Sequence, residues 1–177
     1  MNRLEPERLI LRPFSPQDED AFIAGIGDGE LRQMYGFPAE LSRDTASRIF
    51  AQFSSLSTAL SLVRRGDETM IGFLLDIPAE LPESMLRTLP EGGHTLAFAT
   101  FSPYRRQGYM REAIAALMEQ HGRAGDASYL HGGHFPFNRP SKRLLAGLGF
   151  TPCGQHSVGS WTVIDEIRIL QGGSNDS

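Results

Sequence analysis

Apolar and polar residues alternate in several short runs of this chain, and this alternation predicts half-buried β-strands. The runs cover residues 8–12, 61–65, 70–75, 94–101, 127–133 and 160–170. Arg65, Gly66 and Asp67 separate the second run from the third, and a Gly-Asp turn of this kind predicts a hairpin. We expect the last run to form the final strand, at or near an edge of the sheet.

Apolar residues at helical spacing predict helices between these strands. The expected helices include residues 21–23 and cover 30–35, 42–53, 112–120 and 140–148. Ser42 or Thr45 is a candidate N-cap for the third helix, and Asn138 or a neighbour for the last, which Gly149 ends. Residues 78–93 are rich in Pro, Glu and Gly, so they predict a long loop.

The length and the charge of the chain narrow its class. With 177 residues, 17 basic and 21 acidic side chains and a formal net charge of -4, the chain fits one domain and lacks the positive charge that nucleic acids attract. We expect the domain to span residues 1–170 and residues 171–177 to be a disordered tail.

The N-terminal residues are charged and contain no apolar stretch, so we expect a cytoplasmic protein that does not bind membranes. The only cysteine, Cys153, excludes an internal disulfide and is expected to be a small packing residue.

A glycine-containing turn joins the strand at 94–101 to the helix at 112–120. The first turn of a helix leaves backbone N–H groups without intrahelical acceptors, and the helix dipole adds about half a positive charge there. Gly108 lets a ligand approach the main chain closely. This junction therefore predicts an anion site suited to a phosphate.

Four segments of the chain resemble one protein family. Residues 105–110 resemble the Gln/Arg-x-x-Gly-x-Gly/Ala signature of the GNAT superfamily of N-acetyltransferases, although Met110 stands where the family has a small residue. Residues 138–150 resemble its second signature, an Asn, a Ser three residues later and a helix ending in Leu-Gly-Phe. Residues 7–13, and Trp161 with Asp165, resemble the opening strand and closing hairpin of the ribosomal-protein (Rim-type) N-acetyltransferase branch.

This resemblance implies an α/β (α+β) fold, the GNAT fold. In it, helices flank a mixed, mostly antiparallel, twisted sheet of about seven strands, splayed between the fourth and fifth strands. It also implies acetyl-CoA as co-substrate, with the pantetheine arm pairing with the main chain of Ala99, Thr100 and Phe101. Asn138 is expected to hydrogen-bond the pantetheine or a water beside it, or else only to cap its helix. The residues implied for the phosphate-binding turn are Arg105, Arg106, Gln107, Gly108, Tyr109, Met110 and Arg111.

The implied reaction is direct attack of a neutral amine on the acetyl thioester, with no covalent enzyme intermediate. Leucines occupy the stretch where many relatives carry a tyrosine as the acid. The resemblance to the Rim-type branch, which places a serine near the coenzyme sulfur, implies that Ser141 protonates the departing thiolate instead. As an alternative, Ser141 serves only the local backbone of its helix. His94, His134 and water are the candidates for removing the ammonium proton. His131 and His134 also suggest a metal site, but no third ligand lies near them in the sequence, so we expect no metal.

The expected function is an acetyl-CoA-dependent N-acetyltransferase that acts on a protein N-terminus, an amino acid or a small amine. The expected partner is a small-molecule or peptide amine, without nucleic acid or membrane, and the chain is expected to be a monomer or a homodimer. Two alternatives remain. The chain transfers a different acyl group, or it is a non-catalytic module that binds acyl-CoA or a protein partner on the GNAT fold.

Overall fold

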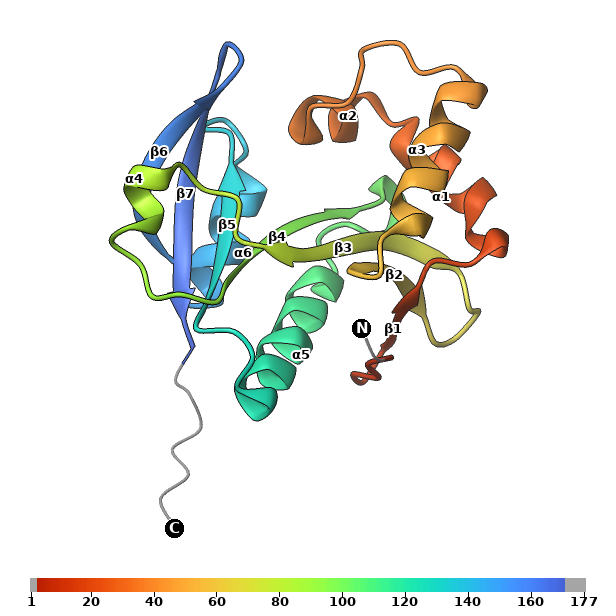
Figure 1. Cartoon of the computed structure of the whole chain (residues 1–177). Helices are drawn as coiled ribbons and strands as arrows, with labels where there is room; N and C mark the ends of the chain where they lie inside the picture. Colours follow the sequence, from red (N-terminus) through yellow and green to blue (C-terminus); the bar gives the residue numbers. More distant parts are fainter. Residues whose placement is uncertain (1–2, 171–177) are drawn as a thin grey trace. The chain divides into compact units, whose positions relative to one another are not determined.

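The computed structural model describes residues 3–170. Its strands form a seven-stranded mixed sheet in the order β1-β2-β3-β4-β5-β7-β6 (Figure 1). The strands are β1 Leu9–Pro13, β2 Ala59–Arg64, β3 Met70–Pro78, β4 Gly93–Thr100, β5 Tyr129–His134, β6 Thr151–Val158 and β7 Trp161–Ile169. The pairs β1–β2, β2–β3, β5–β7 and β6–β7 are antiparallel, whereas β4 and β5 run parallel. The predicted mixed sheet of about seven strands is therefore confirmed.

The helices follow the predicted order, with one addition. They are α1 Glu19–Ile26, α2 Gly29–Tyr35, α3 Arg43–Ser55, α4 Glu83–Leu86, α5 Tyr109–Ala124 and α6 Arg139–Gly147, with 3₁₀ turns η1 Pro16–Asp18 and η2 Ser102–Tyr104. Ser42 is the N-cap of α3, because its hydroxyl accepts a hydrogen bond from the amide of Thr45 at 3.2 Å. No helix of residues 3–170 combines the length and the apolar character needed to cross a membrane.

The final strand, β7, lies near an edge of the sheet, as predicted, because its neighbours are β5 and the largely exposed edge strand β6. Two other predictions are wrong. Residues 78–93 are not a plain loop, because α4 begins after Pro82, whose carbonyl accepts the amides of Met85 and Leu86. Cys153 lies on β6 and is exposed, not packed in the interior. The predicted tail, 171–177, lies outside the described residues.

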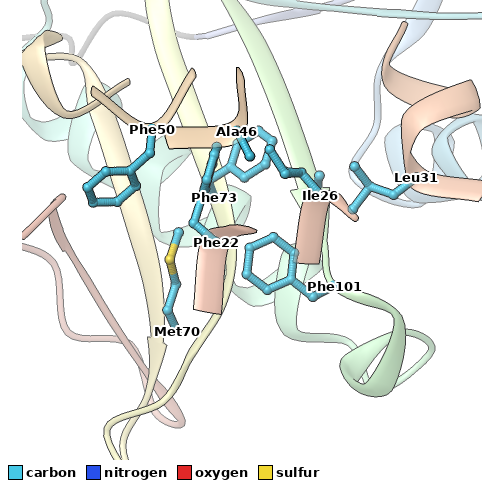
Figure 2. Packing of buried hydrophobic residues seen from close by; sticks show 9 residues of the cluster. Phe22, Ile26, Leu31, Ala46, Phe50, Met70, Phe73 and Phe101 are labelled. Atoms are coloured by element: carbon cyan, nitrogen blue, oxygen red, sulfur yellow. The ribbon is translucent and has the colours of Figure 1, made fainter. Parts of the chain in front are cut away.

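Contacts divide the chain into two units, which are described separately. The first unit comprises residues up to Leu75 and Phe98–Ala116. Its core is a largely aromatic cluster built from α1, α2, α3, β3 and the end of β4 (Figure 2). The buried members are Phe22, Ile26, Leu31, Ala46, Phe50, Met70, Phe73, Ala99 and Phe101. The ring of Phe22 lies 5.6 Å from that of Phe50 and 5.7 Å from that of Phe73, so α1 and α3 are packed against β3.

β3 contains a bulge within the first unit. Its register against β2 shifts by one residue at Ile71, which lies between the paired residues Met70 and Gly72. The bulge brings Met70 and Phe73 into the same core cluster, although they are three residues apart. At Gly72, a Cβ atom would lie 2.3 Å from the carbonyl oxygen of Ala99, so the close approach of β3 and β4 requires glycine.

The second unit comprises Asp76–Ala97 and the residues from Leu117 onward. Helix α6 packs on β5 at Gly132, where a Cβ atom would lie 2.9 Å from the side chain of Leu145. The β4–β5 ladder pairs Gly93 to Leu96 with Tyr129 to Gly132 and ends there among the described pairs, although β5 continues to His134. This is the strand pair at which the resemblance implies a divergence.

Candidate functional site

The predicted phosphate-binding turn lies in the first unit, between η2 and α5. Arg106 has a φ of +61° and Gly108 a φ of +79°, so two of three consecutive residues adopt the left-handed conformation. A side chain makes this conformation unfavourable at Arg106, and such local strain is often found at binding sites. Residues 106–108 are exposed. The main chain therefore enters the first turn of α5 at the surface, as an anion site requires.

Arg105 anchors this turn instead of extending into solvent. Its guanidinium donates to Asp28 and to Glu30, each at 2.6 Å, and to the carbonyl oxygen of Thr100 at 3.2 Å. Because two carboxylates already face it, this side chain has little capacity left for a phosphate. Asp28 also caps α2 by accepting hydrogen bonds from the amides of Glu30 and Leu31. Arg105 thus ties the turn to α2, a role that residue spacing did not indicate.

Arg8 supports the other side of the turn. Its guanidinium donates to Glu112 at 2.7 Å and to the carbonyl oxygen of Gln107 at 2.9 Å, and it lies 4.6 Å from the ring centroid of Tyr109. The sequence assigned Arg8 only to the opening strand. Tyr109 and Met110 are both buried. The long side chain of Met110, which departs from the family signature, therefore points into the interior and does not crowd the turn.

The main-chain groups at the end of β4 differ in whether they face β3 or point away from it. The amide of Phe101 donates to the carbonyl oxygen of Ile71 on β3 at 2.9 Å, and the carbonyl of Ala99 also faces β3 at Gly72. Because main-chain groups alternate in direction along a strand, the N–H of Thr100 points away from β3. Of the three residues predicted to contact pantetheine, Thr100 has the amide best placed for this role.

Asn138 and Ser141 lie together in the second unit, at the start of α6. The side-chain oxygen of Asn138 accepts a hydrogen bond from the amide of Ser141 at 3.2 Å, so Asn138 is the N-cap of this helix. Asn138 is buried and Ser141 is half-buried. Capping uses only the oxygen of Asn138, so its amide NH₂ group is left for another partner.

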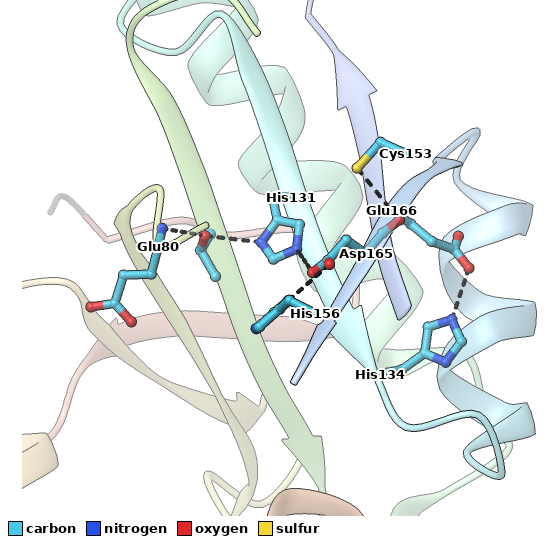
Figure 3. A network of polar contacts seen from close by, with 8 residues as sticks. Glu80, His131, His134, Cys153, His156, Asp165 and Glu166 are labelled. Atoms are coloured by element: carbon cyan, nitrogen blue, oxygen red, sulfur yellow. Dashed lines mark hydrogen bonds and ion pairs between the residues drawn. The ribbon is translucent and has the colours of Figure 1, made fainter. Parts of the chain in front are cut away.

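Both ring nitrogens of His134 have hydrogen-bond partners. Its Nε2 lies 2.8 Å from Glu166 (Figure 3). Its Nδ1 lies 3.0 Å from the carbonyl oxygen of Phe135. The carbonyl oxygen can only accept, so Nδ1 carries a hydrogen. The ring is buried, and the geometry leaves no ring nitrogen facing solvent.

A second network in the same unit includes the buried carboxylate of Asp165. One oxygen lies 2.9 Å from Nε2 of His131 and the other 2.8 Å from Nδ1 of His156 (Figure 3). Nδ1 of His131 lies 3.0 Å from the hydroxyl of Thr95, which accepts from the amide of Glu80. Burial lowers the pKa of His131, and the hydrogen bond to Asp165 offsets this only in part.

His94 lies apart from His134 within the second unit, in a cluster around Asp76. Its Nδ1 lies 2.8 Å from one carboxylate oxygen of Asp76, and Nε2 of His121 lies 2.9 Å from the other. The two histidines named as candidate bases therefore belong to separate networks. The sequence did not single out Asp76 or His121, because the residues of this cluster come from β3, β4 and α5.

Several known proteins are similar to this chain. A family model described as an acetyltransferase (GNAT) domain matches residues 8–151. A GNAT-family acetyltransferase from Bacillus anthracis aligns at 15% identity and a TM-score of 0.79, over 95% of this chain and 98% of that one. A ribosomal-protein alanine acetyltransferase from Vibrio fischeri aligns at 16% identity and a TM-score of 0.71, over 97% and 98%. RimL, a ribosomal-protein alpha-N-acetyltransferase in complex with coenzyme A, aligns at 18% identity and a TM-score of 0.74, over 96% and 98%. No curated protein sequence matches the chain.

These similarities confirm the fold expected from the sequence. The solved structures support the arrangement of the seven strands and their flanking helices over nearly the whole chain. The family model covers most of the chain and includes both the turn at 105–108 and the start of α6. The chain therefore belongs to the GNAT family of acetyltransferases.

Proposed function

We propose that the protein is an acetyl-CoA-dependent N-acetyltransferase that acetylates a primary amine. The observation that carries this proposal is the turn at 105–108, where two left-handed residues lead an exposed main chain into α5. In our proposal, N–H groups of Gly108, Tyr109 and Met110 bind the diphosphate of the coenzyme. Arg105 and Arg8 act indirectly, because their contacts fix the shape of the turn.

The reaction we propose is direct transfer. The amine nitrogen attacks the carbonyl carbon of the thioester, the carbon–sulfur bond breaks, and the coenzyme leaves as a thiolate. The N–H of Thr100 stabilises the negative charge on the thioester oxygen. Ser141 donates its hydroxyl proton to the thiolate and recovers a proton from solvent. The amide NH₂ group of Asn138, which capping does not use, binds the pantetheine arm.

We propose water as the acceptor of the proton that the attacking amine loses. Both ring nitrogens of His134 already have hydrogen-bond partners, and the ring is buried. His94 is held against Asp76 beside His121, whose ring centroid lies 4.8 Å away. Water is therefore the candidate that needs no rearrangement of these networks.

For the acceptor we propose the α-amine of a peptide or protein. The support is the similarity in fold to RimL and to the Vibrio fischeri enzyme, which are described as acetyltransferases of ribosomal proteins. Free amino acids and small amines are the competing acceptors.

A thiol-release assay tests the proposed function. Purified protein is mixed with acetyl-CoA and a panel of peptides with free N-termini, amino acids and small amines, and the acetylated product is identified by mass spectrometry. N-terminally blocked peptides without lysine are the matched control. We expect thiol release and an acetylated α-amine only with the free peptides. If the protein binds the coenzyme but releases no thiol with any acceptor of the panel, the result would support a non-catalytic module instead. If turnover is faster with a longer acyl-CoA than with acetyl-CoA, the transferred group is that longer acyl group and not acetyl.

A further inference from the structure

A cluster of potential metal ligands lies in the second unit, separate from the residues assigned above to the coenzyme. We propose that Asp76, His94 and His121 bind one divalent transition-metal ion, with Zn²⁺ the ion best suited to the donor set. This proposal does not depend on the acetyltransferase assignment.

The ligand atoms already converge on a shared position. One atom from each of the three residues lies within 4.8 Å of the others, so only small side-chain shifts would bring all three to the bond lengths of about 2.0–2.2 Å that zinc forms with nitrogen and oxygen. The two ring nitrogens face different oxygens of the Asp76 carboxylate, at 2.8 Å for His94 and 2.9 Å for His121. Two imidazole nitrogens and one carboxylate oxygen form a common ligand set of zinc sites that keep an open position.

The second ring nitrogen of His121 strengthens the case for a metal. Nδ1 of His121 lies 2.6 Å from a carboxylate oxygen of Asp126. A histidine that binds a metal usually donates its other N–H to a carboxylate, which fixes the ring and makes it a better ligand. Asp126 therefore lies in the position of a carboxylate that orients the ring of His121 for metal binding.

The charge of the cluster also fits a divalent cation. As metal ligands, both imidazoles are neutral, so Asp76 and Asp126 leave a formal charge of about -2 for these four side chains. Asp76 and His121 are buried, where uncompensated charge is costly. The side chain of Asp126 is 56% exposed, so a bound divalent ion would mainly compensate the buried carboxylate of Asp76.

The Asp165 network is a useful contrast inside the same unit. Asp165 is also a buried aspartate between two histidines, His131 and His156, at similar distances. Among residues 3–170, however, only the Asp76 group has three ligand atoms close enough to share an ion. Both networks join an aspartate to two histidines, but only the Asp76 group brings three ligand atoms close together. A substitution of His156 is therefore a matched control for substitutions of His94 and His121.

The donor set also predicts which ions bind. Imidazole nitrogens favour Zn²⁺, Co²⁺ and Ni²⁺, whereas Mg²⁺ and Ca²⁺ prefer oxygen ligands. The ligands come from the end of β3, the start of β4 and the second half of α5, so a bound ion would link these three segments. The side chain of His94 is 25% exposed, which gives solvent or another ligand access to the cluster.

Calorimetric titration of the full chain, without a histidine tag and after chelator treatment, tests the proposal. We expect one Zn²⁺ per chain, no saturable binding of Mg²⁺ or Ca²⁺, and a Co²⁺ complex with visible absorption bands. His94→Gln and His121→Gln should each weaken Zn²⁺ binding by at least about 100-fold. Asp126→Asn should weaken it by about 10- to 100-fold, as for other groups that orient a ligand. His156→Gln should leave it unchanged.

Several results would overturn the site. These are the absence of saturable Zn²⁺ binding to the wild-type chain, equal affinity in the His121→Gln and His156→Gln variants, or a Co²⁺ spectrum that does not change in His94→Gln. The wild-type titration and spectrum decide the question even if a variant fails to fold. Coenzyme binding measured on the same samples separates failure of the metal site from failure of the acetyltransferase assignment.

Discussion

The left-handed conformation of Arg106 is the residue-level feature that most distinguishes the turn before α5. An arginine gains nothing locally from a φ of +61°, so neighbouring contacts must hold it there. Those contacts come from the side chains on either side of the turn, Arg105 to α2 and Arg8 to Gln107. The result is a preformed main-chain surface, which reduces the entropy cost of binding an anion.

Ser141 provides a test of the proposed chemistry at one atom. Ser141→Ala removes the hydroxyl but keeps the amide that Asn138 caps, so the start of α6 should be preserved. We expect turnover to fall by about 10²-fold, the scale of general acid catalysis, with coenzyme affinity unchanged. Stopped-flow thiol release and calorimetry measure the two quantities. Unchanged turnover would remove Ser141 from the mechanism.

His131 predicts a dependence of stability on pH. Burial lowers its pKa in the folded state below about 6.5, the value for an unfolded chain, so the folded protein binds this proton less readily. The contribution of the buried neutral ring to the free energy of unfolding is fully present above about pH 6.5. It is lost as the pH falls through the pKa of the folded state. Asp165, His156 and Thr95 are the side chains that face His131 in this network.

Urea unfolding between pH 7.5 and 5 measures this effect. The free energy of unfolding of the wild type should fall more steeply with acid than that of His131→Asn. The His156→Gln variant should retain the steeper slope, because it keeps the buried ring of His131. Equal slopes for the wild type and His131→Asn would show that burial of this ring does not set the pH dependence.

At the scale of elements, two substitutions of Asn138, the N-cap of α6, separate its role in helix capping from its proposed role in coenzyme binding. Asn138→Ala removes the N-cap and should lower the free energy of unfolding by about 1 kcal/mol. Asn138→Asp keeps a capping oxygen but loses the NH₂ group, so its stability should be close to wild type while its coenzyme affinity falls. Denaturant unfolding and calorimetry check the pair. If both variants bind coenzyme normally, Asn138 is only a helix cap.

The predicted elements were accurate where local sequence alone decides the structure. The alternation in β1 and β3, the Gly-Asp hairpin turn, and the caps Ser42 and Asn138 all act within a few residues. The errors have a different origin. α4 is one short turn set by Pro82, and the strand β6, which carries Cys153, has almost no buried side chains, so Cys153 is exposed there.

The site was less predictable than the fold, because its decisive contacts join distant positions. The motif indicated the turn and Gly108, but not that Arg105 pairs with Asp28 and Glu30 or that Arg8 reaches Gln107. Likewise, histidine spacing drew attention to His131 and His134, whereas the converging ligands belong to the Asp76 group. Such pairings depend on the folded chain and leave no local signal.

At the scale of the whole molecule, the proposed function depends most on the turn at 105–108, which lies in the first unit. The exposed residues of this turn lead into the first turn of α5, and the proposal assigns the diphosphate of the coenzyme to them. Binding of the diphosphate at this turn is therefore the central claim.

A calorimetric comparison of coenzyme A with phosphopantetheine tests this claim most directly. Phosphopantetheine keeps one phosphate but lacks the second phosphate and the adenosine part of coenzyme A. Gly108→Ala strains a left-handed residue, and Gly66→Ala is the control because that glycine has open space and no positive φ. We predict that coenzyme A binds the wild type about tenfold or more tightly than phosphopantetheine, as expected for hydrogen bonds to a charged group. Gly108→Ala should reduce that difference and Gly66→Ala should keep it. Equal affinity of the wild type for the two ligands, or an unchanged difference in Gly108→Ala, would contradict the proposed coenzyme site.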